Sequence, residues 1–296
     1  MKIIVCIKEV VDTGLSLDFG LSNRVVFREG LPLRLNPNDA EALSMALALK
    51  SADKVSAVEI TLISIGPERV ESYLRDGLAV GADKAVRIWG EDFQELSAYQ
   101  KAKLLSRAVS LFGADLVLAG ARSLDTGNGQ AGALMAAWLD KPCVSEVVSL
   151  ELARESDSIN LMKDIGRGQR ETIQCSIPAV ITIKGEGRKL PYASLDKLLE
   201  SKSSEVMLLS LTDLGISVEE LKNDPTRVIG LVYPRPRPKK IPTPESSLPA
   251  FDRIMKLLEG GISHRQGRML EGSSEELADQ LFELLINEGV IHPATD

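Results

Sequence analysis

The residues best placed to do chemistry in this 296-residue chain lie in a glycine-rich stretch at 115–132. The apolar run at 116–119 has the composition of a strand buried on both faces, and Gly120 ends it. Thr126 can cap a following helix, and the glycines at 127, 129 and 132 let backbone N–H groups approach a ligand. Such a helix start attracts phosphate, because its unpaired N–H groups and its dipole both favour an anion. An ordinary strand-to-helix connection carries similar residues, so both interpretations stay open at this point.

Catalysis by the chain's own side chains has little support. Its three cysteines (Cys6, Cys143 and Cys175) form no CxxC pair, and Cys6 and Cys175 lie in apolar runs typical of buried thiols. The two histidines, His264 and His292, lie far along the chain. No Ser/His/Asp, Cys/His or zinc-binding set can be assembled from these residues. The sequence therefore leaves room for the chemistry of a bound cofactor.

Charge and hydropathy narrow the class of protein. The net charge is −7 and no basic cluster is present, which argues against nucleic acid as a partner. No apolar run is long enough to cross a bilayer, and the run at 3–7 is followed at once by Glu9, so we expect a first strand there. An odd number of cysteines without pairing motifs suits a reducing compartment. We expect a cytoplasmic protein without membrane insertion.

The first half of the chain alternates strands and helices. We predict strands at 2–7, 58–65, 82–88 and 115–119, with helices from Asn38 or Asp39 to about Lys50, at 67–80 and at 98–112. This alternation is typical of a doubly wound, mostly parallel α/β sheet of Rossmann-like, adenine-nucleotide-binding type. Ligands of such sheets bind beyond the carboxyl ends of strands, where strand order reverses. The loops after residues 7, 65 and 119 are therefore expected to line one crevice.

The second half changes character. Runs at 144–153, 159–163, 171–176 and 179–184 are separated by polar turns, and we expect them to form an antiparallel extension of the sheet. A helix follows within 185–205. Six prolines between 234 and 249 indicate an extended arm, and helices are expected near 250–259 and 274–288. The expected organisation is a nucleotide-binding domain at 1–232, a proline-rich linker at 233–250, and C-terminal helices at 251–296 that dock on the core or on another subunit.

The order of the motifs resembles one known family, the beta subunit of electron transfer flavoprotein, including the related FixA proteins. The resemblance begins with VCIKEVVDT (5–13), FREGLPLRLNPNDAEAL (27–43) and ISIGPERVESYLRDGLAVGADKAV (63–86). LAGARSLDTGNGQAG (118–132) is similar to the family's AIDxDxxQxG loop, with Asp125, Gln130 and Gly132 on the shared positions. KDIGRGQRETIQCSIPAVITI (163–183) resembles the family signature, from which Arg167 and Arg170 depart. DPTRVIGLVYP (224–234) and the segment 271–291 resemble the family's C-terminal arm and last helix.

The resemblance implies a heterodimer in which the alpha subunit carries the redox FAD and the beta subunit holds an adenine nucleotide. That nucleotide is AMP in ordinary members and a second FAD in electron-bifurcating members. The positions that match this site are Cys6, Lys8, Asn36, Ile65, Gly120, Ala121, Asp125, Gly127, Asn128, Gly129, Gln130, Ala131 and Gly132. By this resemblance the N–H groups of 127–132 bind phosphate, Asp125 orders the loop or accepts from a ribose hydroxyl, and Cys6 and Ile65 form apolar walls. Alternatives stay open for four of these residues. Cys6 and Ile65 can be plain core residues, Asp125 a turn or helix-capping aspartate, and Lys8 a solvated lysine at a strand end.

LPYASLDKLLESK (190–202) resembles the loop with which the family recognises partner dehydrogenases. The resemblance implies that Tyr192 and Leu195 recognise the partner, with Leu195 as the anchor. Leu195 as a core leucine of a helix at 194–200 is the competing interpretation.

The expected function is an electron-carrier subunit rather than an enzyme. It relays electrons between flavin dehydrogenases, or NADH in a bifurcating member, and an acceptor such as a quinone oxidoreductase or ferredoxin. AMP or FAD is left open: the block at 28–39 resembles bifurcating members, whereas Thr126, Gly127 and Asn128 depart from the usual loop. A nucleotide-binding enzyme of the same superfamily needs an SGGxDS-type loop, where this chain has KEVVDTG (8–14). A homodimeric nucleotide sensor leaves 163–183 and 234–291 without a use.

Overall fold

The computed structural model describes residues 1–14, 31–52, 58–90, 93, 96–153, 158–227, 229, 244–258 and 271–287. The chain divides into two compact units, Met1–Tyr233 and Pro234–Asp296. Residues 233–243 of the predicted linker, and 27–30 of the motif at 27–43, lie outside the described residues. None of the helices in the described part of the chain combines the length and the apolar character that crossing a bilayer requires.

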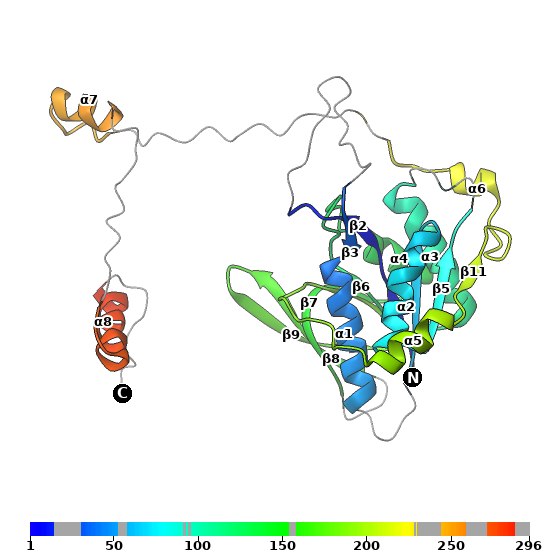
Figure 1. Cartoon of the computed structure of the whole chain (residues 1–296). Helices are drawn as coiled ribbons and strands as arrows, with labels where there is room; N and C mark the ends of the chain where they lie inside the picture. The colour runs from blue at the N-terminus through cyan, green and yellow to red at the C-terminus, as the bar shows by residue number, and fades with distance from the viewer. Residues whose placement is uncertain are drawn as a thin grey trace. The chain divides into compact units, whose positions relative to one another are not determined.

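Within the described residues, the first unit contains one nine-stranded sheet with the order β11-β5-β4-β1-β6-β10-β7-β8-β9 (Figure 1). The parallel part consists of β1 (Lys2–Cys6), β4 (Glu59–Ile65), β5 (Lys84–Ile88), β6 (Leu116–Gly120), β10 (Ala179–Ile183) and β11 (Met207–Leu209). The antiparallel extension consists of β7 (Cys143–Leu152), β8 (Ser158–Gly166) and β9 (Gln169–Ser176). A small separate sheet pairs β2 (Glu9–Val11) with β3 (Leu33–Leu35). The predicted fold class is confirmed.

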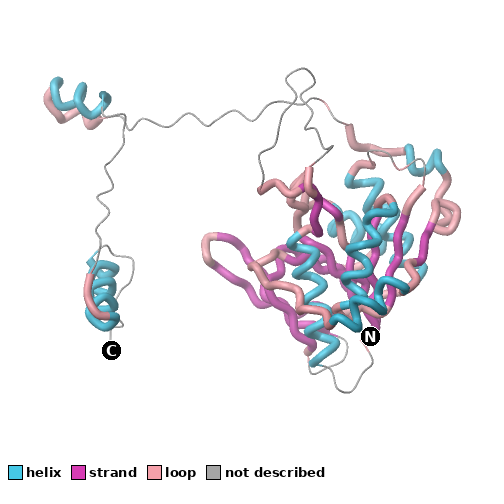
Figure 2. Tube along the Cα trace, in the orientation of Figure 1, coloured by secondary structure: helices cyan, strands magenta, loops and turns pink. Residues whose placement is uncertain are grey.

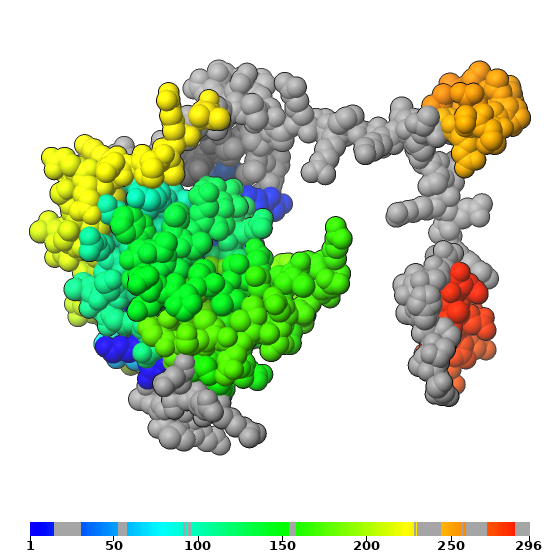
Figure 3. Space-filling model, turned by 180° about the vertical axis from the view of Figure 1, so that it is seen from behind, coloured from blue at the N-terminus to red at the C-terminus, as the bar shows by residue number. Residues whose placement is uncertain are grey.

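The direction of β10 corrects one prediction. The run at 179–184 was expected among the antiparallel pieces, but β10 is parallel to both β6 and β7 and lies between them. All five of its residues are buried, as befits a strand covered on both faces, whereas β7 to β9 mix buried and exposed positions. The hairpin of β8 and β9 stands out from the body of the first unit (Figures 1 and 3).

Helices cover both faces of the sheet (Figure 2). The helices of the first unit are α1 (Pro37–Ala52), α2 (Glu71–Ala79), α3 (Ala98–Phe112), α4 (Ala131–Leu139), α5 (Leu195–Ser203) and α6 (Val218–Lys222), with a 3-10 turn, η1, at Glu68–Val70. Alternate residues of β1 point to opposite faces. Ile3 and Val5 join the apolar core that includes α1 and α2, while Ile4 and Cys6 join the core that includes α3 and α4.

Three helices begin at other residues than predicted. Helix α2 begins at Glu71, after the 3-10 turn η1, whereas the prediction begins at residue 67. Helix α1 begins at Pro37, before the predicted caps Asn38 and Asp39. A proline is favoured at the first helical position because it lacks the N–H that would be unpaired there. Helix α4 begins at Ala131, so Thr126 does not cap it. The glycines at 127 and 129 adopt positive φ angles of 61° and 62°, which interrupt the right-handed helical path between Thr126 and the helix.

The second unit contains α7 (Ala250–Leu258) and α8 (Ser274–Asn287), as predicted near 250–259 and 274–288. No residue of α8 is buried. Phe251, Ile254 and Leu258 of α7 are exposed, as are Leu281 and Phe282 of α8.

The capping box of α3 generates a prediction. The Ser97 hydroxyl accepts from the backbone N–H of Gln100, whose side chain accepts in turn from the N–H of Ser97. Replacing Ser97 with alanine is expected to destabilise the first unit by about 1 kcal/mol, because one N–H of the first helical turn loses its partner. Urea unfolding measures this loss. Ser110→Ala, at an exposed position of the same helix, is the control and should change stability little. Equal stabilities for the two variants would contradict the role of the box.

Candidate functional site

The order of the strands reverses between β1 and β6. The chain leaves β1 through α1 and reaches β4 on one side, and it later leaves β5 through α3 and reaches β6 on the other side. The carboxyl ends of these two strands, at Cys6 and Gly120, are the place where ligands of doubly wound sheets bind. The structure brings the three predicted loops, after residues 6, 65 and 120, to this edge.

Asp39, in the first turn of α1, joins the ends of the two central strands. Its Oδ2 accepts from the backbone N–H of Lys8 at 2.8 Å, and its Oδ1 accepts from the N–H of Gly120 at 2.9 Å. The approach requires glycine at 120, because a Cβ there would lie 2.2 Å from Asp39 Oδ1. Asn36 Nδ2 donates a third hydrogen bond to Oδ1 at 2.9 Å. Asp39 was not predicted as a site residue.

Burial raises the pKa of two groups at this edge, Asp39 and Cys6. It raises the pKa of Asp39 to about 7, against the hydrogen bonds from Asn36, Gly120 and Lys8, which lower it. Burial, with the nearby charge of Asp39, raises the pKa of Cys6 to about 12. The Cys6 thiol is therefore neutral, and its Sγ lies 4.0 Å from Met135 Sδ in the core with α3 and α4.

Lys8 and Asp125 face each other across the point of reversal. Lys8 Nζ lies 2.7 Å from Oδ1 and 2.9 Å from Oδ2 of Asp125, and Asp125 Oδ1 also accepts from the N–H of Thr126 at 2.7 Å. Burial acts to raise the pKa of Asp125, but the hydrogen bond and the charge of Lys8 hold it below the ordinary range. The two residues thus form one partly buried ion pair that fixes the loop after β6.

Asn36 binds the backbone at the start of the loop after β6. Its Nδ2 also reaches the carbonyl oxygen of Arg122 at 3.2 Å, and its Oδ1 accepts from the N–H of Leu124 at 3.1 Å. The side chain is buried, so both ends of its amide are bound to the chain itself. Asn36 was predicted to contact the ligand, whereas the structure shows it holding the start of the loop.

The glycine-rich loop offers fewer N–H groups than expected. The N–H of Gly127 donates to the carbonyl of Ser123 at 2.9 Å and is therefore paired within the loop, and its role as a phosphate donor stays a prediction. Asn128, Gly129 and Gln130 are exposed, and within the described residues their N–H groups have no recorded acceptor. The first N–H groups of α4, from Ala131, are unpaired by the geometry of a helix. The part of the loop with N–H groups open to a ligand therefore spans 128–131.

The remaining predicted residues differ in burial: Ala121 and Gly132 are buried, Ile65 is half-buried, and Tyr192 and Leu195 are exposed. Ala121 is buried and its N–H donates to the carbonyl of Ile183 at 2.8 Å, so it extends the sheet. Gly132 is also buried, at the start of α4. Ile65 is half-buried at the end of β4 and packs on the core with α3. Tyr192 is fully exposed and Leu195 is 71% exposed, which overturns the alternative of a core leucine at 195.

Arg122 is a residue that the sequence did not single out. Its guanidinium is exposed, with Nε 3.4 Å from Glu146 Oε1, and its Cγ lies 3.4 Å from the place that a Cβ of Gly129 would occupy. The available signal was a cation two residues beyond the end of a buried strand. Its position beside Gly129 places a positive charge next to the 128–131 segment.

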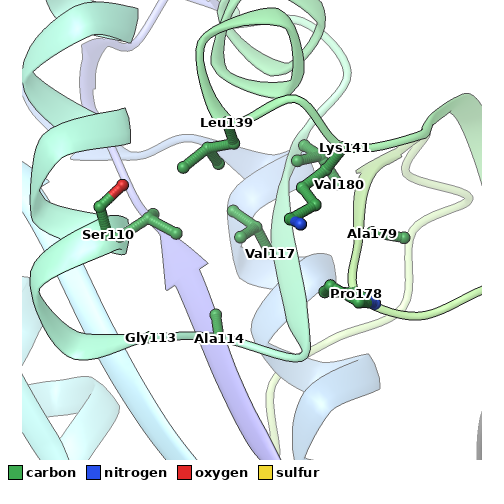
Figure 4. A pocket seen from close by; sticks show the side chains of 10 residues that line it. Ser110, Gly113, Ala114, Val117, Leu139, Lys141, Pro178, Ala179 and Val180 are labelled. Atoms are coloured by element: carbon green, nitrogen blue, oxygen red, sulfur yellow. The ribbon is translucent and has the colours of Figure 1, made fainter.

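A cavity of about 300 Å³ lies at the opposite, amino-terminal edge of the sheet (Figure 4). Ser110 of α3 and Leu139 of α4 face Val117 and Val180 across it. Lys141 is its only charged lining residue. Among the described residues, no group of His, Cys, Asp or Glu is placed to hold a metal ion. The polar and charged side chains described above lie at the carboxyl-terminal edge, away from this cavity.

Comparison with known proteins agrees with this geometry. The family model of the electron transfer flavoprotein domain matches residues 24–214. The chain belongs to the electron transfer flavoprotein beta-subunit family. It is 32% identical over 237 residues to the electron transfer flavoprotein subunit beta of Thermoanaerobacterium thermosaccharolyticum, covering 79% of this chain and 88% of that one.

Two further relatives show the breadth of the family. The subunit beta of Methylophilus methylotrophus is 25% identical over 271 residues, covering 92% of this chain and 97% of that one. Subunit CarD of the caffeyl-CoA reductase-Etf complex of Acetobacterium woodii is 29% identical over 231 residues, covering 77% and 86%. Membership of this family places the chain in electron transport, as an electron-carrier subunit.

The raised pKa of Asp39 predicts a dependence of stability on pH. Between its ordinary value near 4 and about 7 the folded carboxyl keeps its proton while the unfolded one has lost it. The stability that this proton contributes is complete below about pH 4 and is lost as the pH rises through 7, in total about 4 kcal/mol at 1.4 kcal/mol per unit.

Urea unfolding of the wild type and of Asp39→Asn at several pH values measures this effect. The difference in unfolding free energy between the two proteins should shrink with rising pH, because asparagine does not titrate. The same difference at every pH would show that Asp39 is not the group responsible.

Proposed function

We propose that this chain is the beta subunit of a heterodimeric electron transfer flavoprotein and that it holds an adenine nucleotide at the carboxyl edge of its sheet. The observation that carries the proposal is that the loop after β6, at the reversal of strand order, contains both Asp125, which is paired with Lys8, and the exposed residues 128–130. Anions bind where unpaired N–H groups open a helix, and cations beside them strengthen the attraction.

The residues at this edge fit the parts of an adenine nucleotide. The N–H groups of 128–131 and the guanidinium of Arg122 bind phosphate. Asp125 accepts from a ribose hydroxyl while Lys8 holds it in place, and Ile65 provides an apolar wall. Cys6 lies behind this surface, in the core. In this proposal the nucleotide stays bound and intact.

The nucleotide in this subunit is AMP, or a second FAD in a bifurcating heterodimer. The redox FAD shared with the alpha subunit supplies reversible electron storage when it is bound. Electrons arrive from flavin dehydrogenases or NADH and leave to an acceptor such as a quinone oxidoreductase or ferredoxin. The chain itself contributes binding, orientation and a docking surface.

Co-purification with the alpha subunit tests this assignment. After denaturation, chromatography counts the released flavin and AMP per heterodimer. One FAD with one AMP indicates a simple carrier, and two FAD indicate bifurcation. A stable pair that releases neither AMP nor a second FAD would contradict nucleotide binding by this subunit.

The C-terminal helices belong to the same proposal. Phe251, Ile254 and Leu258 of α7 and Leu281 and Phe282 of α8 are exposed apolar residues, and among the side chains that the structure describes neither helix has a buried one. We propose that they dock on the alpha subunit or on the first unit, because exposed apolar faces of this kind require a partner surface.

Replacing Lys8 with methionine is expected to weaken nucleotide binding about tenfold, a loss of about 1.4 kcal/mol. The substitution keeps the length of the side chain but leaves Asp125 without its cation, so the loop loses its anchor and the phosphate loses a positive charge. Equilibrium dialysis of the heterodimer against labelled AMP and labelled FAD measures the change. Lys84→Met, which removes an exposed ion pair with Glu59, is the matched control. Equal affinity for both variants would remove Lys8 from the site.

Replacing Leu195 with alanine is expected to slow electron transfer from the partner dehydrogenase without unfolding the heterodimer. The side chain is 71% exposed, so its loss costs little folding energy but removes an apolar anchor from the docking surface. Stopped-flow reduction of the flavin by the dehydrogenase measures the rate. Leu111→Ala, at another exposed leucine in α3, is the control. Unchanged turnover in Leu195→Ala would contradict its role.

A further inference from the structure

A buried carboxylate of α1 accepts from three consecutive residues of the segment that follows β10. Oε2 of Glu41, in α1, accepts from the backbone N–H groups of Glu186 at 2.9 Å, Gly187 at 3.1 Å and Arg188 at 3.2 Å. Glu41 is 2% exposed, whereas residues 186–188 are exposed. Three consecutive N–H groups therefore converge on one oxygen that comes from 145 to 147 residues away in the chain.

Neighbouring side chains of α1 continue this contact. Asn38 Oδ1 accepts from the N–H of Gly185 at 3.1 Å, while Asn38 Nδ2 donates to the carbonyl of Arg122 at 3.0 Å. Glycine is required at 185, since a Cβ there would lie 2.7 Å from Asn38 Oδ1. One side chain thus ties the start of the nucleotide loop to the start of the segment after β10.

This segment leads directly to the proposed docking surface. The hydrogen bonds of β10 to its neighbouring strand end with the N–H of Lys184, which donates to the carbonyl of Val147 at 2.9 Å. Leu190, where the chain turns outward, packs on the core beside α1. The exposed Tyr192 and Leu195 follow within five residues. Between Lys184 and Leu190 the backbone is held mainly by Asn38 and Glu41. Ser44 Oγ adds a hydrogen bond to the carbonyl of Lys189 at 3.5 Å, and Arg170 pairs with the side chain of Glu186.

A buried carboxylate is an expensive way to pack a helix against a loop, because its charge must leave water. An apolar residue in its place would pack against the core but would offer no acceptor to 186–188. A carboxylate fixes their direction, since charge-assisted hydrogen bonds are short and strong.

We propose that Glu41 is a positioning residue for partner docking: it sets the path of 186–188 and thereby the placement of Tyr192 and Leu195 toward the dehydrogenase. The inference rests on the proposed function of 190–195 as the docking surface. Glu41 acts through the backbone of this segment, and it touches neither the nucleotide nor the partner.

Limited trypsin digestion of the heterodimer tests the positioning directly. Arg188 and Lys189 are exposed cleavage sites within the held segment. In Glu41→Ala the rate of cleavage after these residues should rise about tenfold, and amide hydrogen exchange at 186–188 should speed up, because their acceptor is gone. Lys50→Ala, at the other end of α1, is the control and should match the wild type. Wild-type cleavage and exchange in Glu41→Ala would overturn the proposal.

Kinetics separate positioning from a general loss of structure. With the dehydrogenase that reduces the wild-type heterodimer, Glu41→Ala should raise the KM for the heterodimer about fivefold or more and leave kcat within about twofold, as expected when only docking is weakened. Faster cleavage with an unchanged KM would show that the partner does not read this segment, and would overturn the proposal.

Glu41→Gln keeps an acceptor oxygen without the charge, and it decides the matter if the alanine variant does not fold. Its cleavage rate and KM should lie between those of the wild type and of Glu41→Ala. If Glu41→Ala gives no values, both quantities should still exceed those of the wild type. Wild-type values for both quantities would then overturn the proposal. If no flavin dehydrogenase reduces the wild-type heterodimer, the proposed function fails, while the digestion and exchange results still report on the hold that Glu41 has on 186–188.

Discussion

One buried carboxylate, that of Asp39, joins the two strands between which the sheet reverses its order. By accepting from the N–H groups of Lys8 and Gly120 it fixes the carboxyl ends of β1 and β6 against the first turn of α1. The ion pair between Lys8 and Asp125 depends on that spacing, because each residue follows one of the two strand ends. The exposed residues 128–130 belong to the same loop as Asp125, and Arg122 lies against Gly129 within it. Loss of Asp39 would separate the parts of the site while leaving each strand intact.

The N-terminal part of α1 also contacts the segment after a third strand, β10. Asn38 and Glu41 bind the backbone that follows β10. Polar side chains of α1 between residues 38 and 41 therefore contact the segments that follow β1, β6 and β10. Glycines at 120 and 185 allow this close approach. The first turns of α1 therefore fix the relative positions of the loops that follow these three strands.

The sequence alone predicted the features that depend on local composition. Buried apolar runs marked the parallel strands, and the spacing of apolar residues placed α3 within its observed bounds. It did not predict the direction of β10, which depends on its neighbours β6 and β7 rather than on its own residues. Thr126 carries a good cap signal, but Gly127 and Gly129 turn the chain away from a helix at that point. The roles of Asp39 and Glu41 rest on partners up to 147 residues away, and local patterns carry no information about such contacts.

Photolabelling of the heterodimer with an azido derivative of AMP tests most directly whether the nucleotide lies at the carboxyl edge. After release of the bound nucleotide and irradiation with the probe, mass spectrometry identifies the labelled peptides. Label within 120–132 and beside Ile65, displaced by unmodified AMP or FAD, is the predicted result. Label confined to the opposite edge, around Ser110, Leu139 and Val180, would contradict the site described here.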